Sequence, residues 1–399
     1  MTRHPDSYLE IVNGGDDGDT AAGFLSKRFK YEIQENKPAA AFVCFGANDA
    51  GIGLYPGDNE VLKAQQIAGA KANLENIIKG LKEEGVEDIT LLTPVTYDDR
   101  TNYDTPYANH DGYSDAMALI AANVLDLAEK YDLKVIDTNT LTTAIMGDAI
   151  EAGSTEEEIF QKDRIHPNTR GHFVIASKII ETLYGDDALV ASVEIDAANK
   201  GFHAENAKVS DLVVKDSGIS YTYLANSLPM GIDEAGYEAV HERYGDFVNF
   251  TDSMNNEIIK ITNLADGNYT VSFDGVAIGK YSAEELKRGI NIATNPLNPG
   301  QIAAKEVIDT LMTQLYNFQR VRIIEIVEEH LKTAGMFYGT TMEQKLAWAE
   351  ANETNYKNNF LTYYPQKAEL IAKVNNAKKV AYAKAQPVAH NITVTPVAK

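Results

Sequence analysis

Short apolar runs alternate with longer helical patterns over residues 8–184, and this alternation constrains the fold more than any other feature of the sequence. The short runs have the length of strands, and the longer segments carry the periodicity of helices. This order is typical of a parallel sheet covered by helices on both faces. We therefore predict strands at 8–12, 39–45, 88–92 and 133–137, and helices at about 20–35, 59–84, 114–131 and 169–184.

After Gly185 the pattern changes, and strands dominate to about residue 281. The clearest element is a hairpin of residues 268–273 and 276–281 around Asp274-Gly275, a dipeptide that favours two-residue hairpin turns. Residues 295–300 are rich in Pro and have the composition of a linker, and residues 301–385 have a helical pattern. We predict three domains, with an α/β domain at 1–188, a β-rich module at 189–295 and a helical C-terminal region at 296–399.

The charge of the chain argues against nucleic acid as a partner. Asp and Glu total 58 against 36 Lys and Arg, which gives a net charge of −22 that repels polyphosphates and anionic membrane surfaces. No apolar run is long enough to span a membrane. The single cysteine, Cys44, has no partner for an internal disulfide, and the apolar run around it predicts that it is buried in a strand.

Asp163 and His166 form the first candidate for catalytic chemistry. At this spacing, just before a predicted helix, the two side chains can meet, so that the carboxylate holds the imidazole tautomer and stabilises its protonated form. Acyl transfer requires such a pair. Upstream, Ser154 and Glu157 have the spacing of a capping box, which predicts a short helix before this stretch. The alternative is a structural histidine near the start of a helix.

The second candidate is Gly46-Ala47-Asn48-Asp49, directly after a predicted strand. Open α/β sheets place their sites at the carboxyl ends of strands, where the amide of Asn48 can donate to a developing oxyanion. The alternative is an ordinary turn, because Gly, Asn and Asp all favour turns.

The third candidate is the glycine-rich stretch from Asn13 to Thr20, which follows the predicted strand at 8–12. Glycines let the backbone approach a ligand closely and present an N–H group to it. Asp16, Asp17 and Asp19 suggest a hard cation such as Ca²⁺ as a further interpretation, but their spacing does not match an EF-hand loop. A plain turn of Asx and Gly residues is the simpler alternative.

Together and in this order, the three stretches resemble the sequence blocks of the SGNH, or GDSL-type, ester hydrolase family. The resemblance covers about residues 8–184 and implies a flavodoxin-like α/β/α sandwich, with no cofactor and no metal. It further implies that Asp163 orients His166 as the general base, and that the Gly15 N–H and Asn48 help to form the oxyanion hole. The β-rich and helical regions resemble the C-terminal part of multidomain bacterial members. The matching blocks are Asn13-x-Gly15-x-x-Gly18-x-Thr20, Gly46-Ala47-Asn48-Asp49 and Asp163-x-x-His166-Pro167.

The nucleophile block of this family, Gly-Asp-Ser after the first strand, has no match in the sequence. Ser7 follows Asp6 but stands one residue before the predicted strand at 8–12, in the position of a later loop. We therefore expect the serine to lie upstream of Met1. Residues 1–6 lack the apolar segment of a signal peptide. We expect a secreted or periplasmic protein if such a peptide precedes them, and a cytoplasmic one otherwise.

Two functional hypotheses follow. In the first, the protein is an SGNH-type esterase that acts on an acyl ester of a small molecule or carbohydrate, such as an O-acetylated sugar, by a Ser-His-Asp acyl-enzyme mechanism. In the second, it is a catalytically inactive SGNH-like protein that binds a glycan or a cell-surface partner.

Overall fold

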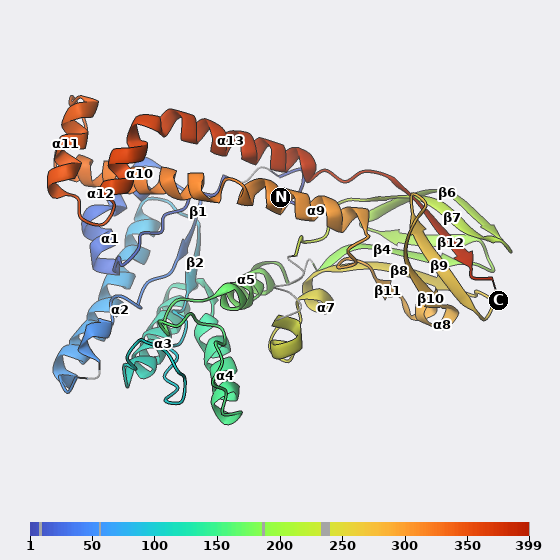
Figure 1. Cartoon of the computed structure of the whole chain (residues 1–399), viewed down its shortest axis with the longest axis horizontal. Coiled ribbons are helices and arrows are strands. Elements are labelled where there is room, and N and C mark those ends of the chain that lie inside the picture. The colour runs from blue at the N-terminus through green and yellow to red at the C-terminus, as the bar shows by residue number, and fades with distance from the viewer. Residues whose placement is uncertain (8–9, 56, 186–187, 233–239, 399) are drawn as a thin grey trace.

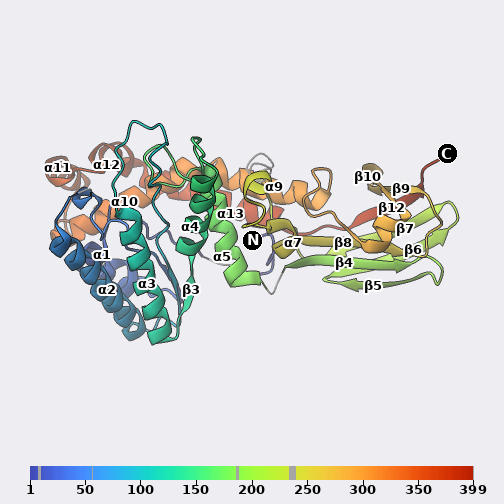
Figure 2. The same cartoon turned by 90° about the horizontal axis from the view of Figure 1, so that it is seen from below.

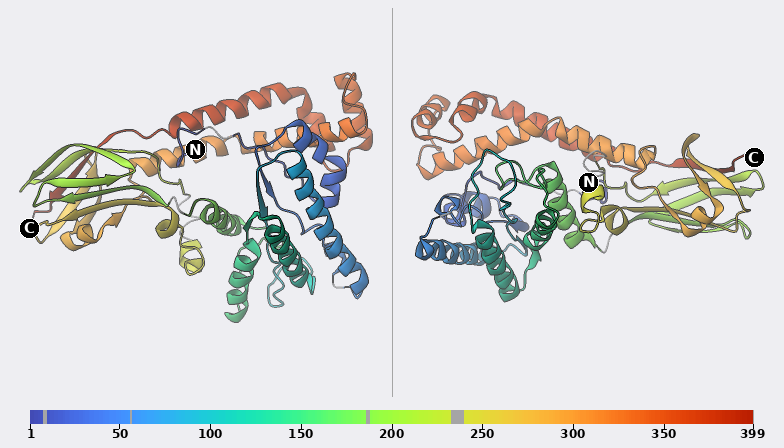
Figure 3. Two further views of the ribbon diagram at one scale, coloured as in Figure 1. Left: turned by 180° about the vertical axis from the view of Figure 1, so that it is seen from behind. Right: turned by 60° about the horizontal axis from the view of Figure 1, so that its bottom comes forward.

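The computed structural model describes residues 1–7, 10–55, 57–185, 188–232 and 240–398. The molecule is elongated (Figure 1), with a part built on a parallel sheet towards one end and a β-sandwich at the other. Long helices near the C-terminus run along one side of the part with the parallel sheet and reach the near end of the β-sandwich (Figure 3). The view from below has the same order of parts (Figure 2).

The N-terminal part is a parallel sheet with the strand order β1-β2-β3. The register pairs Ala41 with Ile89 and Leu91 with Val135. Because the strands are parallel, their carboxyl ends meet at one edge, and the loops that follow them share that edge. The strands are β1 (Ala40–Val43), β2 (Asp88–Leu92) and β3 (Lys134–Ile136).

The α-helices around this sheet bury an apolar side, and α1, α2, α4 and α5 have a side chain as N-cap. Asn59 caps α2 and Asp137 caps α4 by accepting a backbone N–H of the first turn, which satisfies a donor that has no partner within the helix. Buried leucine and isoleucine side chains of α2 and α3 pack with those of β2 in one core. The elements are α1 (Ala21–Lys27), the π-helix η1 (Lys30–Glu35), the 3-10 helix η2 (Ile52–Leu54), α2 (Glu60–Glu83), α3 (Tyr113–Tyr131), α4 (Thr138–Glu151) and α5 (Thr169–Tyr184).

The predicted strand at 8–12 is wrong where the structure describes it. Residues 8 and 9 lie outside the described residues, and residues 10–12 pair with no other strand. The side chains of Ile11 and Val12 are 78% and 66% exposed. An extended segment without a partner gains no ladder hydrogen bonds, so its apolar composition alone does not make it a strand.

Two further local predictions are wrong, and one helix was not predicted. The capping box at Ser154 opens no helix, because its hydroxyl donates to Glu158 instead. Helix α4 is not predicted, since its four threonines and Gly147 have low helix propensity, and the burial of Ile145 and Met146 compensates. Cys44 is exposed rather than buried, and it lies directly after the end of β1 rather than within the strand.

The β-rich module is a sandwich of a four-stranded sheet, β11-β8-β4-β5, and a five-stranded sheet, β10-β9-β12-β7-β6. Buried positions alternate along β4, β7 and β8, as expected of strands with one face in the core. The elements are β4 (Leu189–Asp196), β5 (Gly201–Glu205), β6 (Ala207–Lys215), β7 (Gly218–Ala225), α7 (Phe250–Met254), β8 (Asn256–Thr262), β9 (Asn268–Phe273), β10 (Val276–Ser282), α8 (Ala283–Arg288) and β11 (Ile290–Asn291).

The C-terminal residues form helices and then one strand. Helices α9 and α13 lie side by side, and α10 packs against α11, α12 and α13 (Figure 1). The strand β12 (His390–Pro396), which the sequence pattern did not predict, lies between β7 and β9 in the sandwich. The helices are α9 (Pro299–Met312), α10 (Leu315–Thr333), α11 (Met342–Asn352), α12 (Lys357–Tyr363), the 3-10 helix η4 (Tyr364–Gln366) and α13 (Lys367–Lys384).

The predicted fold class is confirmed: a parallel sheet with helices, followed by additional sheets and C-terminal helices. The division into domains at 188 and 295 stays a prediction. In the part of the chain that the structure describes, no helix is both long and apolar enough to cross a membrane.

Candidate active site

The turn that precedes α5 brings Asp163 and His166 into contact. The ring Nδ1 of His166 lies 2.8 Å from Oδ2 of Asp163, and the backbone N–H of His166 donates to Oδ1 at 3.0 Å. Because Nδ1 faces the carboxylate, the other ring nitrogen, Nε2, is left for chemistry. The His166 side chain is 71% exposed, so a reactant can reach it.

The carboxyl of Asp163 is held in its charged form. Partial burial acts to raise its pKa, but the hydrogen bonds from the backbone and ring of His166, and from the Ile165 N–H, outweigh burial and lower the pKa below its ordinary value. A carboxylate that stays ionised keeps its partner ring oriented and stabilises the ring when it takes up a proton.

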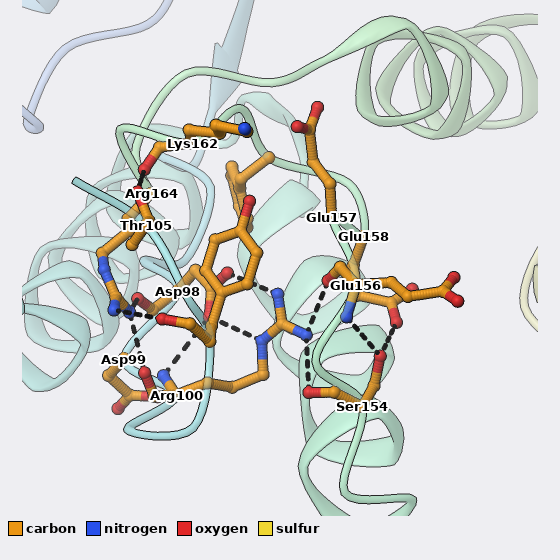
Figure 4. Close-up of polar contacts among 12 residues, drawn as sticks. Asp98, Asp99, Arg100, Thr105, Ser154, Glu156, Glu157, Glu158, Lys162 and Arg164 are labelled. Atoms are coloured by element: carbon orange, nitrogen blue, oxygen red, sulfur yellow. Dashed lines mark hydrogen bonds and ion pairs between the residues drawn. The ribbon is translucent and has the colours of Figure 1, made fainter. Parts of the chain in front are cut away.

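Arg164 anchors this turn to the loop that follows β2 (Figure 4). Its guanidinium is buried and donates to the carbonyl oxygens of Asp98 and Arg100 at 2.9 and 2.8 Å. In return, the Asp98 N–H donates to the Arg164 carbonyl at 3.1 Å. The backbone of Arg164 has a φ of 72°, a left-handed conformation that is uncommon for a residue with a side chain. The contacts of the side chain offset this cost and fix the turn between Asp163 and His166.

The same loop is tied to residues 154–158 (Figure 4). Arg100 forms a buried ion pair with Asp98 at 2.7 Å and donates to the carbonyl oxygens of Ser154 and Glu156. Glu158, also buried, pairs with Arg243 and accepts from the Ser154 hydroxyl. These contacts join three loops into one support for the histidine.

The stretch Gly46–Asp49 follows β1 at the carboxyl edge of the sheet. Gly46 has a φ of 134°, and a Cβ there would lie 2.5 Å from the Ile120 side chain, so only glycine fits. The Asn48 amide donates to the Asp19 carbonyl at 3.1 Å. Asp49 is buried and accepts the Ala21 N–H at 3.0 Å, which ties this stretch to the start of α1.

The loop of residues 13–19 adopts a compact turn. The Gly15 N–H donates to Oδ1 of its neighbour Asn13 at 2.9 Å. Asp19 pairs with Arg28 at 2.7 Å, and Asp16 lies 3.6 Å from the same guanidinium. Two of the three carboxylates thus face an arginine. Within the described ranges, no group of three or more His, Cys, Asp or Glu side chains is arranged to hold a metal ion.

The Asn48–Asp19 hydrogen bond joins the loop that bears Gly15 to the stretch that bears Asn48. Ile165, next to His166, packs against the same apolar core as Ala47, so these two stretches adjoin one core. Among the described residues, no hydrogen bond or ion pair links His166 directly to Asn48 or Gly15.

Ser7 lies away from His166. The ring of His4 packs on Tyr184, at the last residue of α5, with 5.8 Å between ring centroids. The helix has 16 residues, and at about 1.5 Å of rise per residue its two ends are about 24 Å apart. Ser7 is three residues from His4, or at most about 11 Å along an extended chain. Ser7 thus lies towards the end of α5 opposite to His166, and among the described residues no hydrogen bond joins the two.

Sequence reasoning missed the residues that hold these loops. Arg164 lies inside the Asp163–His166 stretch, but nothing in the sequence indicates that its side chain is buried. Arg322 and Tyr356 contact the loop of residues 13–19 from the C-terminal helices. A contact between residues more than 300 positions apart leaves no signal in a single sequence.

Comparisons with known proteins bear on the family and the fold of the chain. Residues 4–173 match the model of the GDSL-like Lipase/Acylhydrolase family. The solved structure of BT4096, a gut microbial diltiazem-metabolizing enzyme, is similar over 100% of this chain and 92% of its own, with a TM-score of 0.86 and 23% identity. At that identity the likeness speaks for the fold alone. The match to Axe2, an acetylxylan esterase from Geobacillus stearothermophilus, covers 43% of this chain and 70% of Axe2 at 21% identity. Its TM-score of 0.35 is too low to indicate a shared fold. No curated protein matches the chain.

Residues 4–173 therefore belong to the GDSL-like lipase/acylhydrolase family, the SGNH/GDSL hydrolases. The resemblance inferred from the three sequence blocks is confirmed. The roles of the individual residues stay predictions.

Proposed function

We propose that this protein hydrolyses an acyl ester by a Ser-His-Asp acyl-enzyme mechanism, with His166 as the general base and Asp163 as the carboxylate that orients it. The observation that carries the proposal is the 2.8 Å contact between His166 Nδ1 and Asp163 Oδ2. It leaves Nε2, on an exposed side chain, free to exchange a proton with a reactant.

The proposed reaction has two halves. Nε2 of His166 takes the proton of a serine hydroxyl, whose oxygen attacks the ester carbonyl. The protonated ring then gives that proton to the leaving alcohol, and an acyl-serine forms. Water next loses a proton to His166 and attacks the acyl group. The ring gives that proton to the serine oxygen as the acid is released, which restores both the serine and the base. Throughout, Asp163 stays ionised and stabilises the imidazolium.

The proposed oxyanion donors are the Asn48 amide and the Gly15 N–H. A side-chain amide has two N–H donors, so Asn48 can donate one to Asp19 and still offer the other to the substrate. The Gly15 N–H is engaged by Asn13, and this side chain must rotate away before the backbone group can bind an oxyanion. Each donor stabilises charge that develops only in the transition state.

The proposed substrate is a short acyl ester, in particular an O-acetyl group on a carbohydrate. The family resemblance of the sequence blocks supports this choice, because it implies an acyl ester as the substrate. Diltiazem, which the enzyme of similar structure metabolizes, belongs in the same test panel.

The test measures ester hydrolysis by the natural full-length protein with p-nitrophenyl acetate, acetylated xylo-oligosaccharides and diltiazem. We expect His166→Ala to lose roughly 10³-fold or more of kcat/KM. A matched control is His203→Ala, an exposed position on β5, which keeps the wild-type rate. Full activity in His166→Ala would overturn the proposal.

A second candidate function is binding of a glycan or surface partner without turnover. Two observations favour it: the described residues include no hydroxyl that hydrogen-bonds to His166, and the Gly15 N–H already has a partner. If the wild-type protein hydrolyses none of the panel but binds xylo-oligosaccharides in calorimetry, this second function replaces the first.

A further inference from the structure

The loop that bears Gly15 is held by side chains rather than by packing. Most residues from 10 to 19 are exposed, and a polar cavity of about 130 Å³ lies between the loop and the C-terminal helices. Glycines at 14, 15 and 18 leave the backbone free to adopt many conformations unless its groups are bonded. The hydrogen bonds that reach this loop therefore decide where the Gly15 N–H points.

Two arginines fix the peptide groups on either side of Gly15. Arg28, at the end of α1 in the N-terminal part of the chain, donates to the Gly14 carbonyl at 2.9 Å. That carbonyl and the Gly15 N–H belong to one planar peptide group and point in opposite directions, so the bond orients the N–H. Arg322 donates through Nε to the Gly15 carbonyl, also at 2.9 Å, and so fixes the next peptide group.

The arginine on α10 is itself held firmly. Its guanidinium is buried, pairs with Glu32 at 2.6 Å and lies 3.7 Å from Glu329. Glu32 also pairs with Arg28, so one carboxylate connects the two arginines. The planar fork of an arginine can meet the Gly15 carbonyl and Glu32 at the same time, which a lysine ammonium at the end of a flexible stem does not reproduce.

Tyr356 adds a second contact from the C-terminal helices. Its hydroxyl donates to Oδ1 of Asp16 at 2.6 Å and accepts the Asp17 N–H at 3.2 Å. Residues 15, 16 and 17 of the loop are thus each bonded to a side chain from the C-terminal helices.

We propose that Arg322 is a positioning residue of the ester-hydrolysis site, and that the C-terminal helices are in this way part of that site. The inference rests on the proposed function, since it assigns to Arg322 the placement of the Gly15 N–H towards the oxyanion. Arg322 acts through the loop and touches no reacting atom.

The experiment compares Arg322→Lys and Arg322→Gln with the wild type in the natural full-length protein. Arg322→Lys keeps the positive charge beside Glu32 and serves if the glutamine variant fails to fold. The matched control is Arg320→Gln on the same helix. Its guanidinium stacks on Tyr363 and bonds to Asn317, and neither residue belongs to the loop.

Two readouts are taken on each variant: hydrogen exchange of the peptide covering residues 13–20, and kcat and KM for p-nitrophenyl acetate. We expect exchange there to rise roughly tenfold in both Arg322 variants. We expect kcat to fall roughly 10- to 100-fold with KM within about twofold, because a misplaced oxyanion donor weakens the transition state more than the ground state. Arg320→Gln keeps wild-type values.

Each other outcome has a distinct meaning. Unchanged exchange and kcat in both Arg322 variants overturn the inference. Faster exchange with unchanged kcat also overturns it, because the contact is then structural only. A wild type that hydrolyses no ester overturns the proposed function, and the inference with it. The wild type alone shows that failure, whereas a failure of the inference shows only in the Arg322 variants.

Discussion

The turn that bears His166 is anchored from within the N-terminal part of the chain, whereas the loop that bears Gly15 is held partly by residues about 300 positions further along. Buried Arg164 fixes the first through two backbone carbonyls. Exposed glycines make up much of the second, and Arg322 and Tyr356 bond to it from the C-terminal region, where Tyr356 also lines a polar cavity. The difference indicates that the proposed base is held by its own part of the fold, while the proposed oxyanion donor depends on the C-terminal region.

The largest effect is expected at the carboxylate of the first region. Asp163→Asn keeps the size of the side chain but removes the charge that selects the His166 tautomer, and kcat should fall roughly 10³- to 10⁴-fold. Asp216→Asn, in the exposed turn between β6 and β7, is the control and should keep the wild-type rate. Steady-state kinetics with p-nitrophenyl acetate measure both. Near-normal kcat in Asp163→Asn would contradict the role assigned to the pair.

The next effect tests whether the first region is anchored by Arg164. Arg164→Gln leaves the carbonyl oxygens of Asp98 and Arg100 without their charged donor, and the free energy of unfolding should fall by about 3–5 kcal/mol. Lys162→Gln, two residues away and exposed, should change it by less than about 0.5 kcal/mol. Urea unfolding followed by circular dichroism gives both values. Equal stabilities would mean that the turn does not need this anchor.

A pH titration tests how much Glu158 contributes to the stability of the loops that support His166. Burial acts to raise the pKa of Glu158, but Arg243, Ser154 and Tyr244 outweigh it and lower the pKa from 4.5 to about 2. A carboxyl with a lowered folded-state pKa stabilises the fold above its unfolded-state pKa, and this contribution is lost as the pH falls from about 4.5 towards 2.

Glu158→Gln removes that contribution, so we expect it to cost about 2 kcal/mol at pH 7 and progressively less below pH 4.5. Glu156→Gln, at an exposed neighbouring position, should follow the wild-type pH profile. The check is chemical unfolding at several pH values. A constant difference between Glu158→Gln and the wild type from pH 7 to pH 3 would rule out the ion pair as its cause.

The smallest effect concerns the second region. Tyr356→Phe removes one hydroxyl that bonds to Asp16 and Asp17, and kcat should fall by about fivefold, the equivalent of about 1 kcal/mol. Tyr316→Phe, on α10 with a side chain that is 72% exposed, is the control. If Tyr356→Phe has wild-type kcat and wild-type exchange in residues 13–20, the C-terminal helices act on the loop through Arg322 alone.

The sequence predicts the strands and helices whose apolar residues are also the residues that pack in the core. The strand Asp88–Leu92 and the helix Thr169–Tyr184 have the predicted bounds. It failed where tertiary contacts decide. Residues 10–12 are apolar but have no strand to pair with, and α4 forms from threonine-rich sequence because its isoleucine and methionine side chains are buried.

In the candidate site, too, spacing along the sequence predicts some contacts and not others. Asp163 and His166 are three residues apart, so their contact could be predicted from spacing and is present in the structure. The bonds from Arg322 and Tyr356 join distant parts of the chain, and the engagement of the Gly15 N–H by Asn13 depends on a local turn. Neither follows from residue types in order along a sequence.

The most direct test of the central claim is covalent labelling of the natural full-length protein with a fluorophosphonate, located by peptide mass spectrometry. This reagent loses fluoride to an activated serine and leaves a stable phosphonyl-serine. The account predicts one labelled serine, other than Ser7, in the wild type and none in His166→Ala. An unlabelled wild type, or equal labelling in His166→Ala, would contradict the assignment of His166 as the base of an acyl-enzyme mechanism.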